Sequence, residues 1–322
     1  MGWTDWKYRR IVPAAMAAAV LTTVGCSGRD VSEAKVESGT VRILWLGSSS
    51  TYFHDMPNQF AKWVSANTDM KAESDLVGRS GTAVYKYLQE DFPVQYGLER
   101  GQTVLERIRE GDYDFVVLQV PTDYLAGRGD NSREDFVAGI RTYCKAIRQA
   151  GGKPVFYEQG WGNDALFDEG DRLLLELAQE LDVPVAPCRT AWRQIREERP
   201  DLELHNLPDR VHPGTLGNYV NLCCFYAAVT GKSPVGLPQR VSRYWRHLTD
   251  EEKAEAREKL AGMTIDDPYV RRLPSWMQRN SISAKVTALD DELAKYFQQV
   301  AWRSWLGYED RRRSGFPSEQ QR

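Results

Sequence analysis

The run Asp114-Phe-Val-Val-Leu-Gln-Val120 constrains the fold of this chain more than any other segment. It is almost wholly apolar, as expected for a strand that is buried on both faces of a parallel sheet. Similar runs lie before and after it and alternate with segments of helical spacing. The five predicted strands are Val41–Leu46, Lys71–Val77, Asp114–Val120, Pro154–Glu158 and Val183–Pro187. Repeated strand–helix–strand units with short connections predict an α/β fold with a five-stranded parallel sheet covered by helices on both faces.

The pattern changes beyond about residue 240, where no strand is predicted. A capping box at Thr249–Glu252 opens a charged helix that extends to about Leu260. A longer amphipathic helix is predicted from Ser283 to Leu306, and the polar residues 309–322 are expected to be disordered. We therefore divide the chain into an α/β domain at 41–240, a helical extension at 241–308 and a tail at 309–322.

The first 40 residues differ in character from the rest. Three basic residues precede an uncharged apolar run, Ile11–Val24, which is shorter than the roughly 20 residues of a spanning helix. This is the pattern of an export signal. The segment before Cys26 resembles a bacterial lipobox, although Thr23 stands where leucine is usual. The resemblance implies a signal at 1–26, a linker at 27–40 and membrane attachment only through a lipid on Cys26, in the periplasm or at the cell surface. The alternative is an ordinary signal peptide cleaved nearby.

Charge and residue spacing exclude several classes of protein. The chain has 322 residues, 42 Lys and Arg and 45 Asp and Glu, so its net charge of −3 gives no global reason to expect nucleic-acid binding. No spacing of His, Cys and carboxylates is typical of a metal site, and no glycine-rich loop fits a dinucleotide or Walker motif. We therefore expect no metal and no cofactor. One disulfide, Cys144 to Cys188, is left open.

Polar residues that can carry chemistry follow the predicted strands. The first strand leads into Gly47-Ser-Ser-Ser-Thr51, where a serine at the start of a helix can serve as a nucleophile. The second strand leads into a loop that contains Gly81. Late in the domain, Asp209 and His212 stand three residues apart, a spacing that allows the carboxylate to orient the imidazole. A surface turn is the alternative reading of that pair taken by itself.

Taken in order, these blocks resemble the SGNH/GDSL hydrolase family over residues 41 to about 236. The resemblance implies a flavodoxin-like, three-layer α/β/α sandwich with Ser49 as nucleophile, His212 as base and Asp209 as its orienting acid. It also implies that the backbone N–H groups of Ser49 and Gly81 stabilise the oxyanion. Ser48 stands where the family often has Asp or Asn, and the neighbouring hydroxyls of Ser48 and Ser50 leave the register of the nucleophile open.

The third block departs from the usual G-x-N-D and is closer to a subgroup with L-Q-x-x-[ST], here Leu118 to Thr122. This likeness implies Gln119 as the third oxyanion donor, with Thr122 as the next candidate. Glu158 and Trp161 follow the fourth strand, where they either contact substrate or pack in the core.

The sequence thus predicts a serine esterase that acts on small-molecule or polysaccharide esters, with O-acetyl groups on extracellular carbohydrate as the first expectation. The choice of carbohydrate rests on family resemblance. Two alternatives stay open. The same triad can transfer the acyl group to a sugar hydroxyl, and a chain with an altered third block can bind carbohydrate at the cell surface without catalysis.

Overall fold

A computed structural model describes residues 39–162, 164–206, 209–243, 248–261 and 285–314. Its main sheet has five parallel strands in the order β2-β1-β3-β4-β5, which is the flavodoxin-like order. The strands are β1 Thr40–Gly47, β2 Lys71–Gly78, β3 Phe115–Pro121, β4 Lys153–Gln159 and β5 Val185–Ala186. The expected α/β fold with a five-stranded parallel sheet is confirmed.

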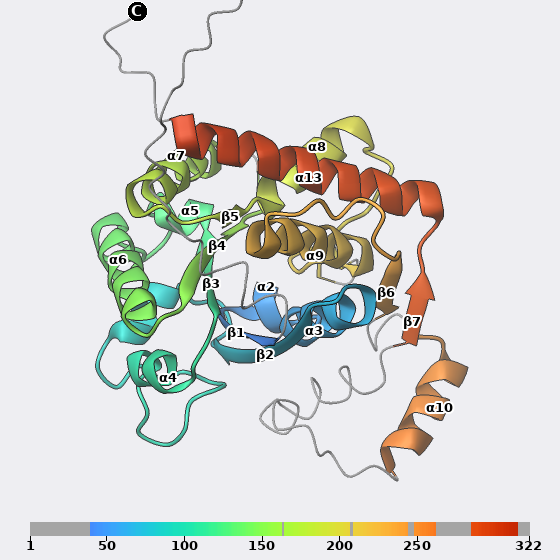
Figure 1. Cartoon of the computed structure of the whole chain (residues 1–322), viewed down its shortest axis with the longest axis horizontal. Coiled ribbons are helices and arrows are strands. Elements are labelled where there is room, and N and C mark those ends of the chain that lie inside the picture. The colour runs from blue at the N-terminus through green and yellow to red at the C-terminus, as the bar shows by residue number, and fades with distance from the viewer. Residues whose placement is uncertain (1–38, 163, 207–208, 244–247, 262–284, 315–322) are drawn as a thin grey trace, which may run out of the picture.

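Helices cover both faces of this sheet and complete the three layers (Figure 1). The helices are α2 Ser49–Tyr52, α3 Met56–Asn67, η1 Val84–Leu88 (a 3-10 helix), α4 Val104–Glu110, α5 Thr122–Leu125, α6 Arg133–Gln149, α7 Ala165–Leu181, α8 Cys188–Glu198, α9 Thr215–Thr230, α10 Asp250–Ala261 and α13 Asp291–Ser314. Helices α3, α8 and α9 lie on one face, and α4, α6 and α7 lie on the other.

The alternation of side chains along β1 explains why both faces need a cover. Ile43 and Trp45 enter the core beneath α3, α8 and α9, whereas Leu44 and Leu46 enter the core beneath α4, α6 and α7. All four side chains are fully buried. A strand whose neighbouring side chains point to opposite faces therefore stabilises two separate cores at once.

The C-terminal region corrects three expectations. It contains two strands, β6 Arg240–Arg243 and β7 Lys285–Ala288, which pair in antiparallel fashion, so the prediction of no strand beyond 240 is wrong. The predicted helix from Ser283 therefore begins only at Asp291, as α13. This helix continues to Ser314, into the segment expected to be disordered. Its last turns are held by Glu309, which is buried and accepts hydrogen bonds from Arg312 and Arg313.

Helix α13 forms an outer layer. It lies across α8 and α9, on the side of these helices that faces away from the sheet (Figure 1). Phe297, Val300 and Ala301 of α13 belong to the same core as the underlying helices, and Gln298 donates hydrogen bonds to Tyr219 Oη and Leu237 O. Helix α13 is therefore packed on the α/β domain and shares its core.

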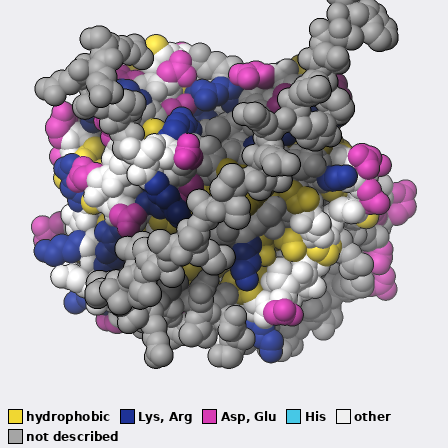
Figure 2. Space-filling model, turned by 45° about the horizontal axis from the view of Figure 1, so that its top comes forward, with side chains coloured by type: hydrophobic (Ala, Val, Ile, Leu, Met, Phe, Trp, Pro, Cys, Tyr) yellow, Lys and Arg dark blue, Asp and Glu magenta, His cyan; other side chains and the backbone are white. Residues whose placement is uncertain are grey.

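On the face in Figure 2, basic and acidic side chains of the described residues are interspersed. Opposite charges also pair between neighbouring helices, as do Arg141 of α6 and Glu180 of α7 at 2.7 Å. Exposed pairs of this kind contribute about 0–1 kcal/mol each.

Cys144, Cys188, Cys223 and Cys224 are all buried and unpaired, so the disulfide left open above is absent from the described residues. Within the same ranges, none of the helices combines the length and the apolar character needed to span a bilayer. Cys26 and the predicted signal lie outside the described residues.

Gly170 should be indispensable to the packing of α7 on α5. A Cβ there would lie 1.9 Å from the backbone oxygen of Thr122, which cannot rotate away. We expect Gly170→Ala to lower the free energy of unfolding by about 1–3 kcal/mol. Gly307→Ala is the matched control, because its Cβ meets nothing within 4 Å, and it should raise the same quantity by about 0.5–1 kcal/mol. Urea denaturation measures both, and equal effects would contradict the packing argument.

Candidate active site

The candidate nucleophile lies in the turn that follows β1. Gly47 ends the strand and Ser48 precedes α2, but the Ser48 side chain does not cap that helix. Ser48 is buried, whereas Ser49 is half-buried and better placed to meet a ligand. A Cβ on Gly47 would lie 2.1 Å from Thr51 Oγ1 and 2.7 Å from Gln119 Oε1. Only glycine lets the strand end so close to these side chains.

Gln119 joins the third sequence block to this turn. It lies on β3, next to β1, and its side chain is fully buried. Its Oε1 accepts hydrogen bonds of 2.6 Å from Ser48 N and from Thr51 Oγ1. Its Nε2 donates to Ser48 Oγ at 3.0 Å and lies 3.3 Å from the Gln159 amide. The predicted oxyanion donor therefore contacts the residue before Ser49.

Two tyrosines join the second block to the same turn. Tyr87 Oη donates to Gly47 O at 3.0 Å, and Tyr52 Oη and Ser80 Oγ share a hydrogen bond of 2.6 Å. Gly81, next to Ser80, is exposed and has φ +63°, a conformation that favours glycine. These contacts bring the Gly81 loop to the segment that holds Ser49.

Asp209 and His212 form a contact within one turn. Asp209 Oδ2 lies 3.2 Å from His212 Nδ1, and Oδ1 accepts from Val211 N at 2.9 Å and His212 N at 3.0 Å. Asn206 Nδ2 also donates to Oδ2 at 2.6 Å. Partial burial raises the pKa of the Asp209 carboxyl, but these hydrogen bonds outweigh it, so the pKa lies well below its usual range. Asp209 is therefore an anion whenever His212 can act as a base.

Phe53 connects this pair to the serine turn. The His212 ring stacks on the Phe53 ring with centroids 4.0 Å apart and planes 6° apart. Phe53 directly follows α2, four residues after Ser49. His212 Nε2 is buried and forms no hydrogen bond within the described ranges, so Ser49 Oγ is not bonded to it in this structure. Such hydrogen bonds often form only when substrate is bound.

The remaining predicted residues lie farther along the carboxyl edge of the sheet. Thr122 begins α5 and is fully buried, with its backbone against α7. Trp161 follows β4 and is half-buried, and its ring stacks on the buried Trp192 with centroids 3.9 Å apart. One face of the Trp161 ring is thus occupied by core packing.

Glu158 is fully buried at the end of β4. Its carboxylate accepts hydrogen bonds from Thr190 N at 2.8 Å and Thr190 Oγ1 at 2.9 Å, at the start of α8. Burial, and secondly the negative charge of Asp171, raise the pKa of Glu158 to about 7. Glu158 therefore supports the position of α8.

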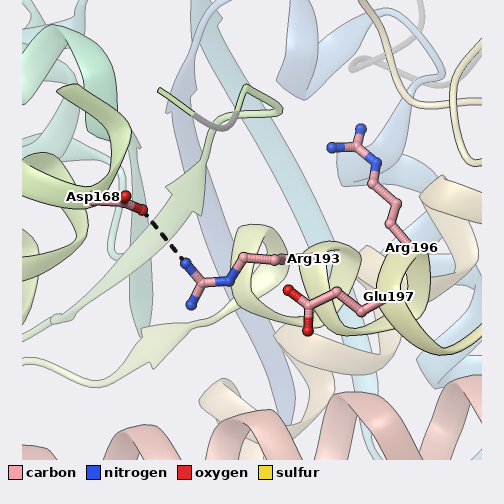
Figure 3. Close-up of a pocket in the computed structure, with 4 residues that line it drawn as sticks. All are labelled: Asp168, Arg193, Arg196 and Glu197. Atoms are coloured by element: carbon pink, nitrogen blue, oxygen red, sulfur yellow. Dashed lines mark ion pairs between the residues drawn. The ribbon is translucent and has the colours of Figure 1, made fainter. Parts of the chain in front are cut away.

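A cavity of about 380 Å³ lies between α7 and α8, lined by Asp168, Arg193, Arg196 and Glu197. Figure 3 shows Arg193 extending toward Asp168, 3.7 Å away, whereas Arg196 leaves the same helix in another direction. Arg196 Nη1 donates to Trp161 O at 2.6 Å and Nη2 lies 3.1 Å from His205 Nε2. Burial lowers the pKa of the Arg196 guanidinium. The cavity therefore offers both hydrogen-bond donors and acceptors beside Trp161.

Sequence reasoning missed the residues that hold the site together. Tyr52, Phe53 and Tyr87 are aromatic residues close in sequence to the first two blocks. This closeness was the signal that could have indicated a role in the site. Asn206, which donates to Asp209, lies three residues before it. In the part of the chain that the structure describes, no group of His, Cys and carboxylate residues is arranged to hold a metal ion.

Comparison with known proteins gives distant relatives. No family model matches the chain. It is 28% identical over 111 residues to Esterase LipI of Mycobacterium tuberculosis, a match that spans 34% of this chain and 33% of that protein. The chain thus covers about a third of the length of this curated relative.

Among solved structures, a DUF4886 family protein from Bacteroides uniformis has TM-score 0.52 and 13% identity, over 83% of this chain and 95% of that one. An acetylxylan esterase from Geobacillus stearothermophilus has TM-score 0.45 and 15% identity, over 61% and 96%. The first likeness agrees with the fold described above.

The raised pKa of Glu158 predicts how stability depends on pH. The unfolded carboxyl has a pKa of 4.5 and the folded one about 7, so between these values only the folded state keeps the proton. The free energy of unfolding should therefore fall as pH rises from 4.5 to 7. We expect Glu158→Gln to flatten this fall in urea denaturation at pH 5, 6 and 7.5. An unchanged slope would show that Glu158 is already ionised across the range.

Proposed function

We propose that the chain is a serine esterase of the SGNH type that hydrolyses carboxylic esters. The observation that carries the proposal is the Asp209–His212 contact, with the ring stacked on Phe53 beside the Ser49 turn. When His212 Nδ1–H donates a hydrogen bond to Asp209 Oδ2, His212 Nε2 has a free lone pair. A buried imidazole nitrogen without a hydrogen-bond partner in the described residues is suited to accept the proton of a nucleophile.

In the proposed reaction, Ser49 Oγ attacks the ester carbonyl while its proton passes to His212 Nε2. Asp209 stabilises the imidazolium, and the N–H groups of Ser49 and Gly81 bind the oxyanion. The tetrahedral intermediate collapses, the C–O bond to the alcohol breaks, and the alcohol leaves with the proton held by His212. Water then attacks the acyl-serine while its proton passes to His212 Nε2. The bond to Ser49 Oγ breaks, His212 returns the proton to Ser49, and the carboxylic acid is released.

Three further findings support this reading. The blocks that are separate in sequence converge on the segment from Gly47 to Phe53 through Gln119, Tyr52 and Tyr87. Esterase LipI, which matches this chain over 111 residues, carries the same type of activity in its name. The order of motifs and the strand order are those implied by the resemblance to SGNH hydrolases.

For the substrate, we propose O-acetyl groups on carbohydrate outside the cytoplasmic membrane. The N-terminal segment supports export, with a lipid on Cys26 as the proposed anchor. The cavity beside Trp161 supports a polyhydroxylated alcohol, because sugar hydroxyls both donate and accept hydrogen bonds. Arg193 and Arg196 supply donors there, and Asp168 and Glu197 supply acceptors.

Ser49→Ala should abolish turnover, because the acyl-enzyme cannot form without the hydroxyl. With p-nitrophenyl acetate, we expect kcat to fall at least about 10³-fold and labelling by a fluorophosphonate to disappear. Ser50→Ala, which changes a half-buried neighbour, should keep both activities. Release of free acetate from an acetylated sugar, measured alongside, separates hydrolysis from transfer to a sugar hydroxyl. Persistent turnover in the Ser49→Ala variant would refute the proposed mechanism.

Arg196→Gln tests the proposed sugar subsite. Loss of the guanidinium should raise KM for acetylated xylo-oligosaccharides about 5- to 50-fold, because donors to the sugar are lost. Hydrolysis of p-nitrophenyl acetate, which has no sugar, should change less than twofold. Arg199→Gln, on the exposed C-terminal side of α8, serves as the control. Equal losses on both substrates would argue against a subsite and in favour of a general distortion of α8.

A further inference from the structure

The side-chain amide of Gln119 has a fixed orientation. Ser48 N–H can only donate, so the atom 2.6 Å from it must be Oε1. This places Nε2 at 3.0 Å from Ser48 Oγ and 3.3 Å from the Gln159 amide. One N–H group of Gln119 is therefore directed at Ser48 Oγ.

An oxyanion donor needs an N–H group that points at the reacting carbonyl. The Gln119 side chain is 1% exposed, and turning Nε2 toward a substrate would leave Ser48 Oγ without its hydrogen bond. A buried polar group left unpaired costs about 1–3 kcal/mol. The observed contacts thus favour a different role for this residue.

We propose that Gln119 is a positioning residue, which fixes the turn after β1 through Ser48 and so orients Ser49 for attack. Gln119 forms hydrogen bonds with two atoms of Ser48, the backbone N and Oγ, and Ser49 is the next residue in the chain. Its third contact, from Thr51 Oγ1 at 2.6 Å, holds the first turn of α2 to the same oxygen. The inference rests on the proposed function.

The same contacts assign distinct roles to the neighbouring serines. Ser48 is 8% exposed, and its hydroxyl is the partner of Gln119 Nε2, which leaves it neither the exposure nor the orientation of a nucleophile. Ser48 also fails to cap α2, because its hydroxyl faces β3. The Ser48 hydroxyl therefore stabilises the turn, and Ser49 is the nucleophile.

The test is a double-mutant cycle with Ser48→Ala, Gln119→Met and the double variant, assayed with p-nitrophenyl acetate. Each single change should lower kcat about 10- to 100-fold with KM within twofold, because a small displacement of a nucleophile costs rate. If Gln119 acts through Ser48, the double variant should be no worse than the poorer single variant. The melting temperature, fluorophosphonate labelling and mass mapping of the labelled serine are measured in parallel.

Multiplicative losses would overturn the proposal, since they would mean that Gln119 contacts the oxyanion independently of Ser48. Unchanged kcat in Ser48→Ala would also overturn it, and this variant decides the matter if Gln119→Met does not fold. Label on Ser48 would reverse the assignment of the two serines. Wild-type protein without Ser49-dependent turnover would refute the proposed function, and the inference with it, whereas normal turnover with a failed cycle refutes the inference alone.

Discussion

The hydrogen bonds between Gln119 and the turn after β1 are the interaction on which the candidate site depends. They join the neighbouring strands β1 and β3 at the carboxyl edge of the sheet, where the strands end in loops. Because the Gln119 amide is buried, its hydrogen bonds are not exposed to competition from water and fix the turn strongly. Gly47 is the structural condition for this contact, since any side chain there would displace Gln119 or Thr51.

The site is built outward from this turn. Tyr52 and Tyr87 attach the Gly81 loop, and Phe53 supports the His212 ring. The last of these contacts brings in a loop that lies more than 150 residues away in the chain. Asp209 fixes that loop internally by accepting backbone and side-chain hydrogen bonds as well as facing the imidazole. Each block therefore has its own physical link to the segment from Gly47 to Phe53.

Much of the fold was predictable from the sequence because strand signals depend on local composition. Val116, Val117 and Leu118 are buried on both faces of the sheet, and such strands read as continuous apolar runs. The capping box at Thr249 and Glu252 was also local, and both of its hydrogen bonds are present. Helix α8 was missed although Cys188, Ala191, Trp192 and Ile195 are buried at helical spacing, because three arginines interrupt the apolar pattern. The strands β6 and β7 pair across more than 40 residues, and pairing at that range has no local signal.

The candidate site was predictable in its residue types but less so in its contacts. The spacing of Asp209 and His212 indicated their contact, because three residues in a turn suffice to bring the side chains together. The partner of the Gln119 amide depends on the rotamer and on the neighbouring strand, and neither can be read from the L-Q-x-x-[ST] pattern. The same holds for Trp161, whose stacking on Trp192 depends on the placement of α8.

The stacking of His212 on Phe53 has a mechanical consequence. The proposed nucleophile and the ring that supports the proposed base belong to one segment of five residues, from Ser49 to Phe53. The stacking contact therefore couples the position of the His212 ring to that of α2, the helix that begins at Ser49.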